Sequence, residues 1–263
     1  MSHKYIQTLD NQSCSEILKQ LKISDKDSHK GDNGKVLIIG GSSLFHAPPI
    51  WSAETVSHFA DMVHLSSTSE NIKLIHDMKV AFRNGIVIPH SKILDYLKED
   101  DVALIGPGMV RGEGEFDINI DEYQDILKII KEEKFSYAIT KYLLKQFPNK
   151  RFVLDAGALQ MMDKNWLLGM NEKVIITPHI KEFFSLFNID LSQRSVEDRI
   201  FIIQETAKKY NVVILLKAVS DIISDGTVTY IIEGGNQGLT KGGTGDILAG
   251  LVVSLYAKND PVL

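Results

Sequence analysis

The sequence predicts a three-layer α/β domain with a mostly parallel sheet, and three observations support this fold class. Short runs of Val, Ile and Leu recur along the chain, and their continuous apolarity is typical of strands buried on both faces. Segments with helical spacing lie between these runs, which is the arrangement of a parallel sheet covered by helices. Near the C-terminus, Asp225-Gly226 is a two-residue turn signal that predicts an antiparallel hairpin at one edge of the sheet.

Each of the six expected strands before the hairpin is bounded on at least one side by Gly, Pro, Asp or Lys. In chain order the strands are Val36–Ile39, Ile86–Ile88, Val102–Ile105, Phe152–Leu154, Val174–Ile176 and Val212–Leu216, followed by the hairpin strands Asp221–Ser224 and Val228–Ile232. Helical spacing of apolar residues predicts helices over Ile120–Lys131 and Val196–Tyr210, and the apolar stretch Ile247–Ala257 predicts a buried helix.

Composition and charge narrow the function classes. The 263 residues are 44% hydrophobic and 24% charged, which is typical of a soluble globular protein. No linker rich in Pro, Gly or Ser interrupts the pattern and no internal repeat occurs, so one domain is expected. The net charge is −5 without a basic block, and nucleic acid is therefore not expected as a partner.

The N-terminus and the single cysteine favour the cytoplasm. Met1-Ser2-His3-Lys4 lacks the charged-then-apolar pattern of a secretory signal, and Cys14 has no second cysteine with which to form a disulfide. The stretch Ile247–Ala257 is much shorter than the roughly 20 apolar residues of a membrane span. We therefore expect a cytoplasmic protein with no membrane partner.

A glycine-rich segment near the C-terminus carries the densest functional signal. Six of the 13 residues from Gly234 to Asp246 are glycines, and the last of them lead straight into a helical pattern. The backbone N–H groups of Gly242–Gly245 would gather at the helix N-terminus, where partial positive charge favours a phosphate. Asp246 then lies in the first helical turn, where a carboxylate can act as a general base on a hydroxyl held beside that phosphate.

A structural role is the alternative for this segment, because Asp246 can cap the helix while the glycines form a flexible loop. Two other phosphate motifs are absent. The pattern G-x-x-x-x-G-K-[ST] does not occur, and Arg111 stands where Gly106-Pro107-Gly108 would need a glycine to complete G-x-G-x-x-G. Walker NTPases and dinucleotide-binding dehydrogenases are therefore disfavoured.

Several further motifs precede the glycine-rich segment. In chain order the set is His29–Lys35 leading to Val36–Ser42, Ala47-Pro48, Gly106-Pro107-Gly108, Val153–Ala156, Thr177-Pro178-His179 with Glu182, Lys217, and Gly243–Asp246. From about Lys30 to the C-terminus, this ordered set resembles the ribokinase-like fold and, within it, the ADP- or ATP-dependent NAD(P)H-hydrate dehydratases. Small-molecule kinases of that fold lack the combination of the early Lys-Gly-Asp-x-Gly segment with Thr-Pro-His-x-x-Glu.

The resemblance implies roles for individual residues. Asp246 matches the catalytic base, and Gly243, Thr244 and Gly245 match the anion hole for the transferred phosphoryl group. The positions matched to the adenine nucleotide, ADP or ATP, are Lys217, Ala218, Val219, Ser220, Asp221 and Gly245. The positions matched to the hydrated nicotinamide nucleotide are Ala47, Gly108, His179 and Asp246. Glu182 and Asp155 lie where the fold commonly organises Mg²⁺ through water.

Structural interpretations compete with these roles when each residue is taken alone. His179 can be a surface or structural histidine, Lys217 can extend from a strand end into solvent, and Gly106-Pro107-Gly108 can be a turn. Trp51 and Trp166 are interpreted as packing residues. The chain also departs from the family pattern where Ala218 replaces a glycine, Val110 replaces a glycine, and Ile180-Lys181 replace Pro-Gly.

The resemblance implies an enzyme that repairs damaged nicotinamide cofactors. It would return the 6-hydroxylated hydrate of NADH or NADPH to NAD(P)H, using ADP or ATP to phosphorylate the hydroxyl before elimination. We expect residues 30–263 to form the catalytic domain and residues 1–29 to be a helical extension packed on it, and the resemblance implies a homo-oligomer, a tetramer. A vitamin or sugar kinase of the same fold and a non-catalytic nucleotide-binding module remain alternatives.

Overall fold

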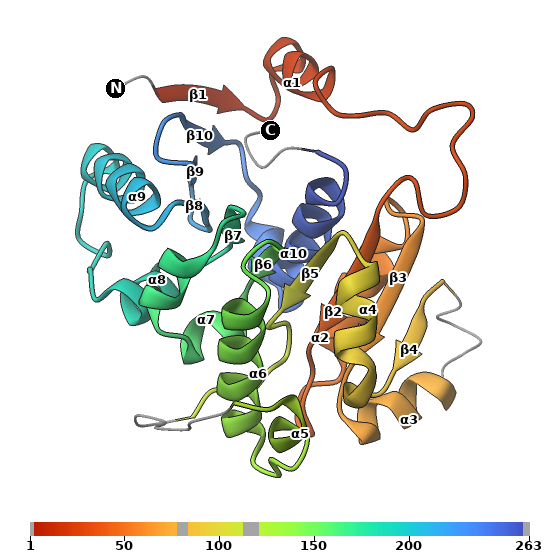
Figure 1. Cartoon of the computed structure of the whole chain (residues 1–263). Coiled ribbons are helices and arrows are strands. Elements are labelled where there is room, and N and C mark those ends of the chain that lie inside the picture. The colour runs from red at the N-terminus through yellow and green to blue at the C-terminus, as the bar shows by residue number, and fades with distance from the viewer. Residues whose placement is uncertain (1–2, 78–83, 113–120, 260–263) are drawn as a thin grey trace.

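The structure is a computed structural model that describes residues 3–77, 84–112 and 121–259. Within these residues, one ten-stranded sheet has the order β1-β10-β9-β8-β7-β6-β5-β2-β3-β4. Neighbouring strands are parallel except that β9 is antiparallel to both β8 and β10 (Figure 1). The bounds are β1 (His3–Gln7), β2 (Lys35–Ile39), β3 (Met62–Ser66), β4 (Ile86–Ile88), β5 (Val102–Ile105), β6 (Arg151–Leu154), β7 (Val174–Ile176), β8 (Val212–Leu216), β9 (Asp221–Ser224) and β10 (Thr229–Glu233).

Helices cover both faces of the sheet, which confirms the expected three layers (Figure 1). One face packs against α4 to α9, and the other packs against α2, α3 and α10. The bounds are α1 (Asn11–Leu18), α2 (Ala47–Val56), α3 (Ser69–Asp77), α4 (Ile93–Glu99), α5 (Tyr123–Ile126), α6 (Glu132–Gln146), α7 (Ala156–Met161), α8 (Ile180–Phe187), α9 (Val196–Tyr210) and α10 (Thr244–Tyr256), with short 3-10 turns at His90–Lys92, Lys164–Gly169 and Gln237–Thr240. None of the helices in the described residues is long and apolar enough to cross a membrane.

Strand β2 shows why the strands are continuous apolar runs. Val36 and Ile38 point into the core shared with α2 and α10, whereas Leu37 and Ile39 point into the core beneath α4. All four side chains are fully buried. Successive residues of a strand face opposite sides, so a strand covered on both faces needs an apolar residue at every position.

The strands expected from the apolar runs are present, but two further strands were not expected. β3 lies between β2 and β4, and β1 pairs in parallel with β10. Because β1 covers β10, the hairpin formed by β9 and β10 lies one strand inside the edge rather than at it. The segment 1–29 therefore contributes a strand as well as the helix α1.

The helix expected over Ile120–Lys131 is wrong. Within this range only Tyr123–Ile126 form a helical turn, and Ile120 lies outside the described residues. A longer helix, α6, begins at Glu132, the residue after the expected end. Tyr123 and Ile126 are buried, but Ile130, the next residue on the same stripe, is 94% exposed. In the second half of the segment Leu127 and Ile129 pack against the core instead of Ile130, so the buried positions do not follow the helical spacing. By contrast, α9 has the predicted bounds.

Candidate active site

The predicted site residues gather at the edge of the sheet where the parallel strands end. Gly106-Pro107-Gly108 follows β5, Asp155 follows β6, His179 lies just beyond β7, and Lys217 follows β8. These four strands are neighbours in the sheet, so their carboxyl ends meet. Open α/β sheets bind ligands in the crevice outside such strand ends. The motifs far apart in the sequence therefore share one site.

Helix α10 begins in a turn that favours glycine and that α2 holds in place. Gly243 has a φ of +98°, and a Cβ atom at this position would lie 2.6 Å from the ring of Trp51. The next residue of α2, Ser52, donates from its hydroxyl to the carbonyl oxygen of Asp246 at 2.9 Å. Helix α2 therefore fixes both the entry to α10 and its first turn.

The first turn of α10 presents backbone N–H groups next to a cation. These groups have no acceptor within the helix, and the positive end of the helix dipole favours an anion there. The Thr244 hydroxyl donates to the carbonyl oxygen of Leu239 at 2.7 Å, with that of Lys241 2.9 Å away, so it fastens the loop. A Cβ atom at Gly245 would lie 3.6 Å from the ammonium nitrogen of Lys217. N–H groups and an ammonium group thus lie side by side.

Asp246 has a carboxyl group tuned toward neutral pH. Burial raises the pKa of Asp246 to about 6, and the negative charge of Asp155 adds to this effect while the ammonium group of Lys217 opposes it. A general base works best when its pKa is near the pH at which the enzyme operates. Near neutral pH the carboxylate form of Asp246 can therefore accept a proton, and the carboxylic acid form can release it again.

Lys217 lies between two buried carboxylates. Its Nζ atom is 2.8 Å from Oδ1 of Asp155 and 3.9 Å from Oε2 of Glu182, and the two acidic side chains are only 2% and 5% exposed. Thr177 donates to the same oxygen of Asp155, and Gln160 donates to Glu182. Burial opposes the charge of Lys217, but the carboxylates outweigh burial and raise its pKa. The ammonium group therefore stays charged.

His179 begins helix α8 as its N-cap. The Nδ1 atom accepts hydrogen bonds from the backbone N–H groups of Lys181 and Glu182, both at 3.1 Å, and Glu182 accepts from the His179 N–H in return. This is a capping box with histidine in the usual place of Ser or Thr. Because Nδ1 accepts, the proton of the neutral ring is on Nε2, and the side chain is 48% exposed. A structural role and ligand contact are therefore compatible.

The segment after Lys217 forms a tight, exposed turn. The backbone N–H of Ala218 donates to Oδ1 of Asp221 at 2.8 Å, whereas Val219 is 96% exposed. Burial raises the pKa of Asp221, while the Ala218 N–H and the charge of Lys217 act in the opposite direction. The turn thus presents backbone and an apolar side chain to solvent beside the cation.

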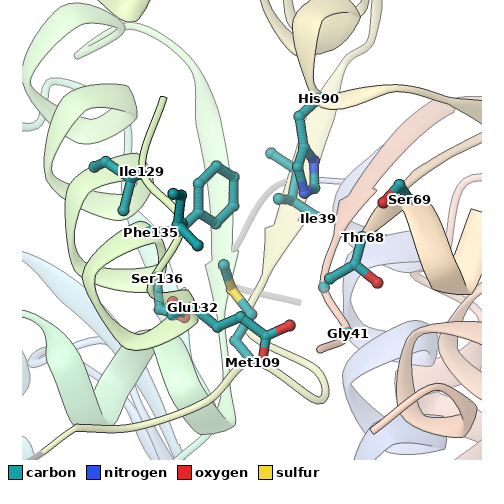
Figure 2. A pocket seen from close by; sticks show the side chains of 12 residues that line it. Ile39, Gly41, Thr68, Ser69, His90, Met109, Ile129, Glu132, Phe135 and Ser136 are labelled. Carbon is teal, nitrogen blue, oxygen red and sulfur yellow. Dashed lines mark hydrogen bonds between the residues drawn. The ribbon is translucent and has the colours of Figure 1, made fainter. Parts of the chain in front are cut away.

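Ala47 and Gly108 lie at the N-terminal end of α2. Ala47 is the first residue of α2, and a Cβ atom at Gly108 would lie 3.2 Å from both the carbonyl oxygen of Phe45 and Cβ of Pro48. It would also lie 3.3 Å from Cα of Gly41, which lines a cavity of about 230 Å³ (Figure 2). Gly108 therefore lies against Gly41 in one wall of this cavity.

Comparison with known proteins decides the family. The chain is 34% identical over 244 residues to the ADP-dependent (S)-NAD(P)H-hydrate dehydratase of Nitrosopumilus maritimus, covering 88% of this chain and 76% of that protein. The profile of the carbohydrate-kinase-related family described as NAD(P)H-hydrate dehydratase matches residues 36–263. The chain belongs to the NAD(P)H-hydrate dehydratase family.

Other dehydratase relatives and solved structures agree. The chain is 34% identical over 254 residues to the bifunctional NAD(P)H-hydrate repair enzyme Nnr of Methanocaldococcus jannaschii, covering 94% of this chain and 44% of that longer protein. The ADP/ATP-dependent NAD(P)H-hydrate dehydratase of Bacillus subtilis superposes with a TM-score of 0.71 at 23% identity, covering 94% of this chain and 81% of the other. A ribokinase-like protein of Enterococcus faecalis gives 0.74 at 23%, covering 98% and 81%. The ribokinase-like fold is thereby confirmed.

The carboxylates of this dehydratase do not form a ready-made inner coordination shell for Mg²⁺. Among the described residues, no group of three or more His, Cys, Asp or Glu side chains is placed to hold a metal ion. Asp155 and Glu182 already pair with Lys217, and their oxygens accept hydrogen bonds from neighbouring groups. Mg²⁺ commonly keeps several waters and binds substrate phosphates, so the donor set fits contact through water rather than direct ligation.

Trp51 packs against Gly243, in agreement with the packing role expected for it. Two other residues of the dehydratase site were not expected from the sequence, namely Ser52, which holds the first turn of α10, and Gln160, which holds Glu182. Their functional significance comes from contacts between residues 22 to 194 positions apart. The Ala47-Pro48 motif at the start of α2, the helix of Ser52, was the available signal, because the resemblance matches Ala47 to the substrate.

Proposed function

We propose that this dehydratase returns the 6-hydroxylated hydrate of NADH or NADPH to NAD(P)H while consuming ADP or ATP. The observation that carries the proposal is Asp246, with a pKa of about 6, in the first turn of α10 beside Lys217 and the N–H groups of the glycine-rich turn. Relatives bear both nucleotide names, since the protein of Nitrosopumilus maritimus is ADP-dependent and that of Heterostelium pallidum is ATP-dependent. Either nucleotide is therefore part of the proposal.

Phosphorylation makes the elimination possible, because hydroxide is a poor leaving group and phosphate is a good one. In this proposal Asp246 removes the proton from the 6-hydroxyl group of the hydrate. The oxygen of that hydroxyl group attacks the terminal phosphorus of the nucleotide at the same time. The bond between that phosphorus and the bridging oxygen of the nucleotide breaks. The ring then expels phosphate from C6 and loses a ring proton, which restores the ring double bond.

The anion hole and Lys217 stabilise the transferring group. In this proposal Gly243, Thr244 and Gly245 form the anion hole, because they lie at the N-terminus of α10, where the helix favours the negative charge of a phosphoryl group. The N–H of Thr244 also donates a long hydrogen bond of 3.4 Å to the carbonyl oxygen of Lys241. Lys217 adds a full positive charge beside the anion hole. Because Asp155 and Glu182 hold the ammonium group of Lys217 in place, this group needs little reorganisation during phosphoryl transfer.

The remaining positions are assigned to the two substrates. Residues 217–221 form the exposed turn proposed to hold the adenine nucleotide, together with Gly245. Ala47, Gly108 and His179 are proposed to contact the hydrate, and the exposed edge of the His179 ring supports this assignment. The methyl group of Ala218 narrows the nucleotide turn relative to the glycine of the family pattern.

Magnesium is proposed as the metal of this reaction, reached through water by Asp155 and Glu182. When bound, it supplies positive charge that offsets the charge developing on the phosphate oxygens. The support is chemical rather than geometric, because both carboxylates lie beside the ammonium group that faces the phosphate site.

We also propose that residues 30–263 form the dehydratase domain, that residues 1–29 pack on it, and that the protein acts as a cytoplasmic homo-oligomer, a tetramer. Packing of the extension is supported by the burial of Ile6 and by the hydrogen bond from the Lys22 N–H to Asn259 at 2.8 Å. Light scattering of the purified protein gives the oligomeric state directly.

The decisive experiment supplies purified NADH hydrate or NADPH hydrate with Mg²⁺ and either ADP or ATP. Recovery of the nicotinamide absorbance should require a nucleotide and should release one phosphate for each hydrate converted. A control without nucleotide should show no recovery. If neither nucleotide supports conversion of either hydrate while a vitamin or sugar is phosphorylated, the protein is a kinase and the proposal is wrong.

A further inference from the structure

The cavity beyond Gly108 is separate from the catalytic residues but opens at the same edge of the sheet. Gly40 and Gly41, which follow β2, and Met109, which follows β5, form its wall on the side of the site. The opposite wall comes from the first two turns of α6, where Glu132 and Phe135 lie (Figure 2). At about 230 Å³ it holds one part of a dinucleotide and not the whole.

Helix α2 links this cavity to the catalytic base. Ser52 contacts Asp246, and Ala47 lies five residues earlier on the same helix, which corresponds to about 7.5 Å along the axis. Gly108 lies against Pro48, the second residue of α2, and against Gly41 of the cavity wall. Gly41 and Gly108 are thus the point at which the cavity meets the positions matched to the hydrate.

The cavity has an aromatic wall made by His90 and Phe135. His90 stacks on Phe135 with ring centroids 4.5 Å apart, so the two rings form one wall and leave no gap between them for a ligand. The Nδ1 atom of His90 lies 2.9 Å from the Ser66 hydroxyl, and burial lowers the pKa of the ring to about 4, so the ring is neutral near pH 7.

Glu132 gives the cavity its charge. Both oxygens of this carboxylate accept hydrogen bonds from Ser43, at 2.7 Å from the N–H and 2.9 Å from the hydroxyl, which fixes their position. Each carboxylate oxygen can accept a further hydrogen bond. None of the described residues that line the cavity is Lys or Arg. The cavity therefore favours hydroxyl groups and disfavours a phosphate.

We propose that this cavity receives the adenosine ribose of the hydrate and that Glu132 accepts hydrogen bonds from its hydroxyl groups. The enzyme therefore prefers NADH hydrate, which has a free 2′-hydroxyl, to NADPH hydrate, which has a 2′-phosphate. An acidic residue makes the same discrimination in NAD-binding sites of other folds. This specificity rests on the proposed function, because it assumes that the reacting ring lies at Asp246.

The experiment measures dissociation constants of NADH and NADPH as unreactive probes, and kcat/KM for the two hydrates. The wild-type protein should bind NADH about tenfold more tightly than NADPH, as expected for two like charges a few ångströms apart in partly aqueous surroundings. Glu132→Gln should raise affinity for NADPH and bring the ratio close to one. Glu133→Gln removes the same charge from the next residue, which does not line the cavity, and should leave the ratio unchanged.

The outcomes separate this inference from the proposed function. A ratio near one in the wild type, or an equal change in both variants, overturns the assignment of Glu132. If Glu132→Gln does not fold, the wild-type ratio in low and high salt decides, since screening should weaken a preference that arises from repulsion. Absence of turnover with both hydrates and both nucleotides overturns the proposed function, and a salt-sensitive preference for NADH then still supports the cavity assignment.

Discussion

At Asp246 the needs of catalysis and of stability oppose one another. A carboxylate that lies near Asp155 and is partly removed from water is disfavoured in its charged form, which raises its pKa to about 6. The same shift makes it a suitable base near neutral pH. Strongly shifted groups of this kind concentrate at functional sites. Substitution of Asp246 should therefore change two quantities that can be measured separately, the rate of hydrate turnover and the stability of the fold.

The first consequence concerns turnover. Asp246→Asn keeps the size and capping ability of the side chain but removes its capacity to accept a proton, so hydrate turnover should fall on the order of 100- to 10,000-fold. Nucleotide binding should be retained, because the N–H groups of the turn remain. Nucleotide affinity and single-turnover rates are measured on the same preparation. Near-normal turnover in a folded variant would refute the role of Asp246 as the base.

The second consequence concerns stability against pH. Because the folded-state pKa of Asp246 lies above the ordinary value, its contribution to stability is full below about pH 4 and is lost as pH rises through 6. Asp246→Asn should therefore be more stable than the wild type at pH 8, by on the order of 1 kcal/mol with part of the effect screened by water. Melting temperatures at pH 4 and pH 8 test this. A difference that is the same at both pH values contradicts the shifted pKa.

Lys217 should contribute to nucleotide binding as well as to the stability of the fold. A nucleotide at a hundred times its dissociation constant stabilises the folded state by about 2.7 kcal/mol. Lys217→Ala should reduce this nucleotide-induced rise in melting temperature, whatever its effect on the unliganded protein. Lys181→Ala, at an exposed position, serves as the control. An equal rise in the wild type and in Lys217→Ala removes Lys217 from the nucleotide site.

The sequence indicated which residues gather at the site but not how they pair. The resemblance assigned Asp155 and Glu182 to Mg²⁺ and Lys217 to the adenine nucleotide, without indicating that the ammonium group lies between the two carboxylates. The cap made by His179 was also missed, because histidine is not one of the residues that usually begin a helix. The ion pairs depend on contact between strand ends that are far apart in the sequence, whereas the cap is a local contact between His179 and the two residues Lys181 and Glu182.

At the scale of single elements, the start of α10 depends on one glycine. Gly243→Ala places a methyl group 2.6 Å from the Trp51 ring and forces a φ of +98° on a residue with a side chain, which should cost about 1–3 kcal/mol and lower turnover. Gly242→Ala is the matched control, since a Cβ atom there meets nothing within 4 Å. Chemical denaturation and kinetics of both variants decide. Equal effects would show that flexibility, rather than the contact with α2, explains the glycines.

Strands β3 and β1 were not predicted because neither has the continuous apolar run of the central strands. Strand β3 contains His64, whose polar ring interrupts the apolar run yet is fully buried because Nδ1 lies 2.8 Å from Asp100. That partner is 36 residues away and cannot be inferred from the strand itself. Strand β1 is mostly exposed, with only Ile6 buried, so it lacks the continuous apolarity of the central strands. Long uniform patterns such as β8 and α9 were predictable for the opposite reason.

At the scale of the whole molecule, β1 protects the edge of the sheet nearest the hairpin of β9 and β10. Without β1, the hydrogen-bonding edge of β10 would face solvent, where it could pair with another chain. The end of β1 also contacts the glycine-rich segment, because the Thr8 hydroxyl donates to the carbonyl oxygen of Gly234 at 3.0 Å. The N-terminal residues therefore support both the sheet and the approach to the site.

Ile6 should account for most of the contribution of β1 to stability. Its side chain is 7% exposed and lines an apolar cavity of about 320 Å³ between the sheet and α10, whereas its neighbour Tyr5 is 50% exposed. Ile6→Ala removes buried methyl groups and should cost about 2 kcal/mol, at the low end for such changes because the adjoining cavity already lacks packing partners. Tyr5→Ala, on the opposite face of the same strand, should change stability by less than about 0.5 kcal/mol. Unfolding in urea measures both variants; equal losses would mean that backbone pairing with β10, and not burial of Ile6, holds the extension on the domain.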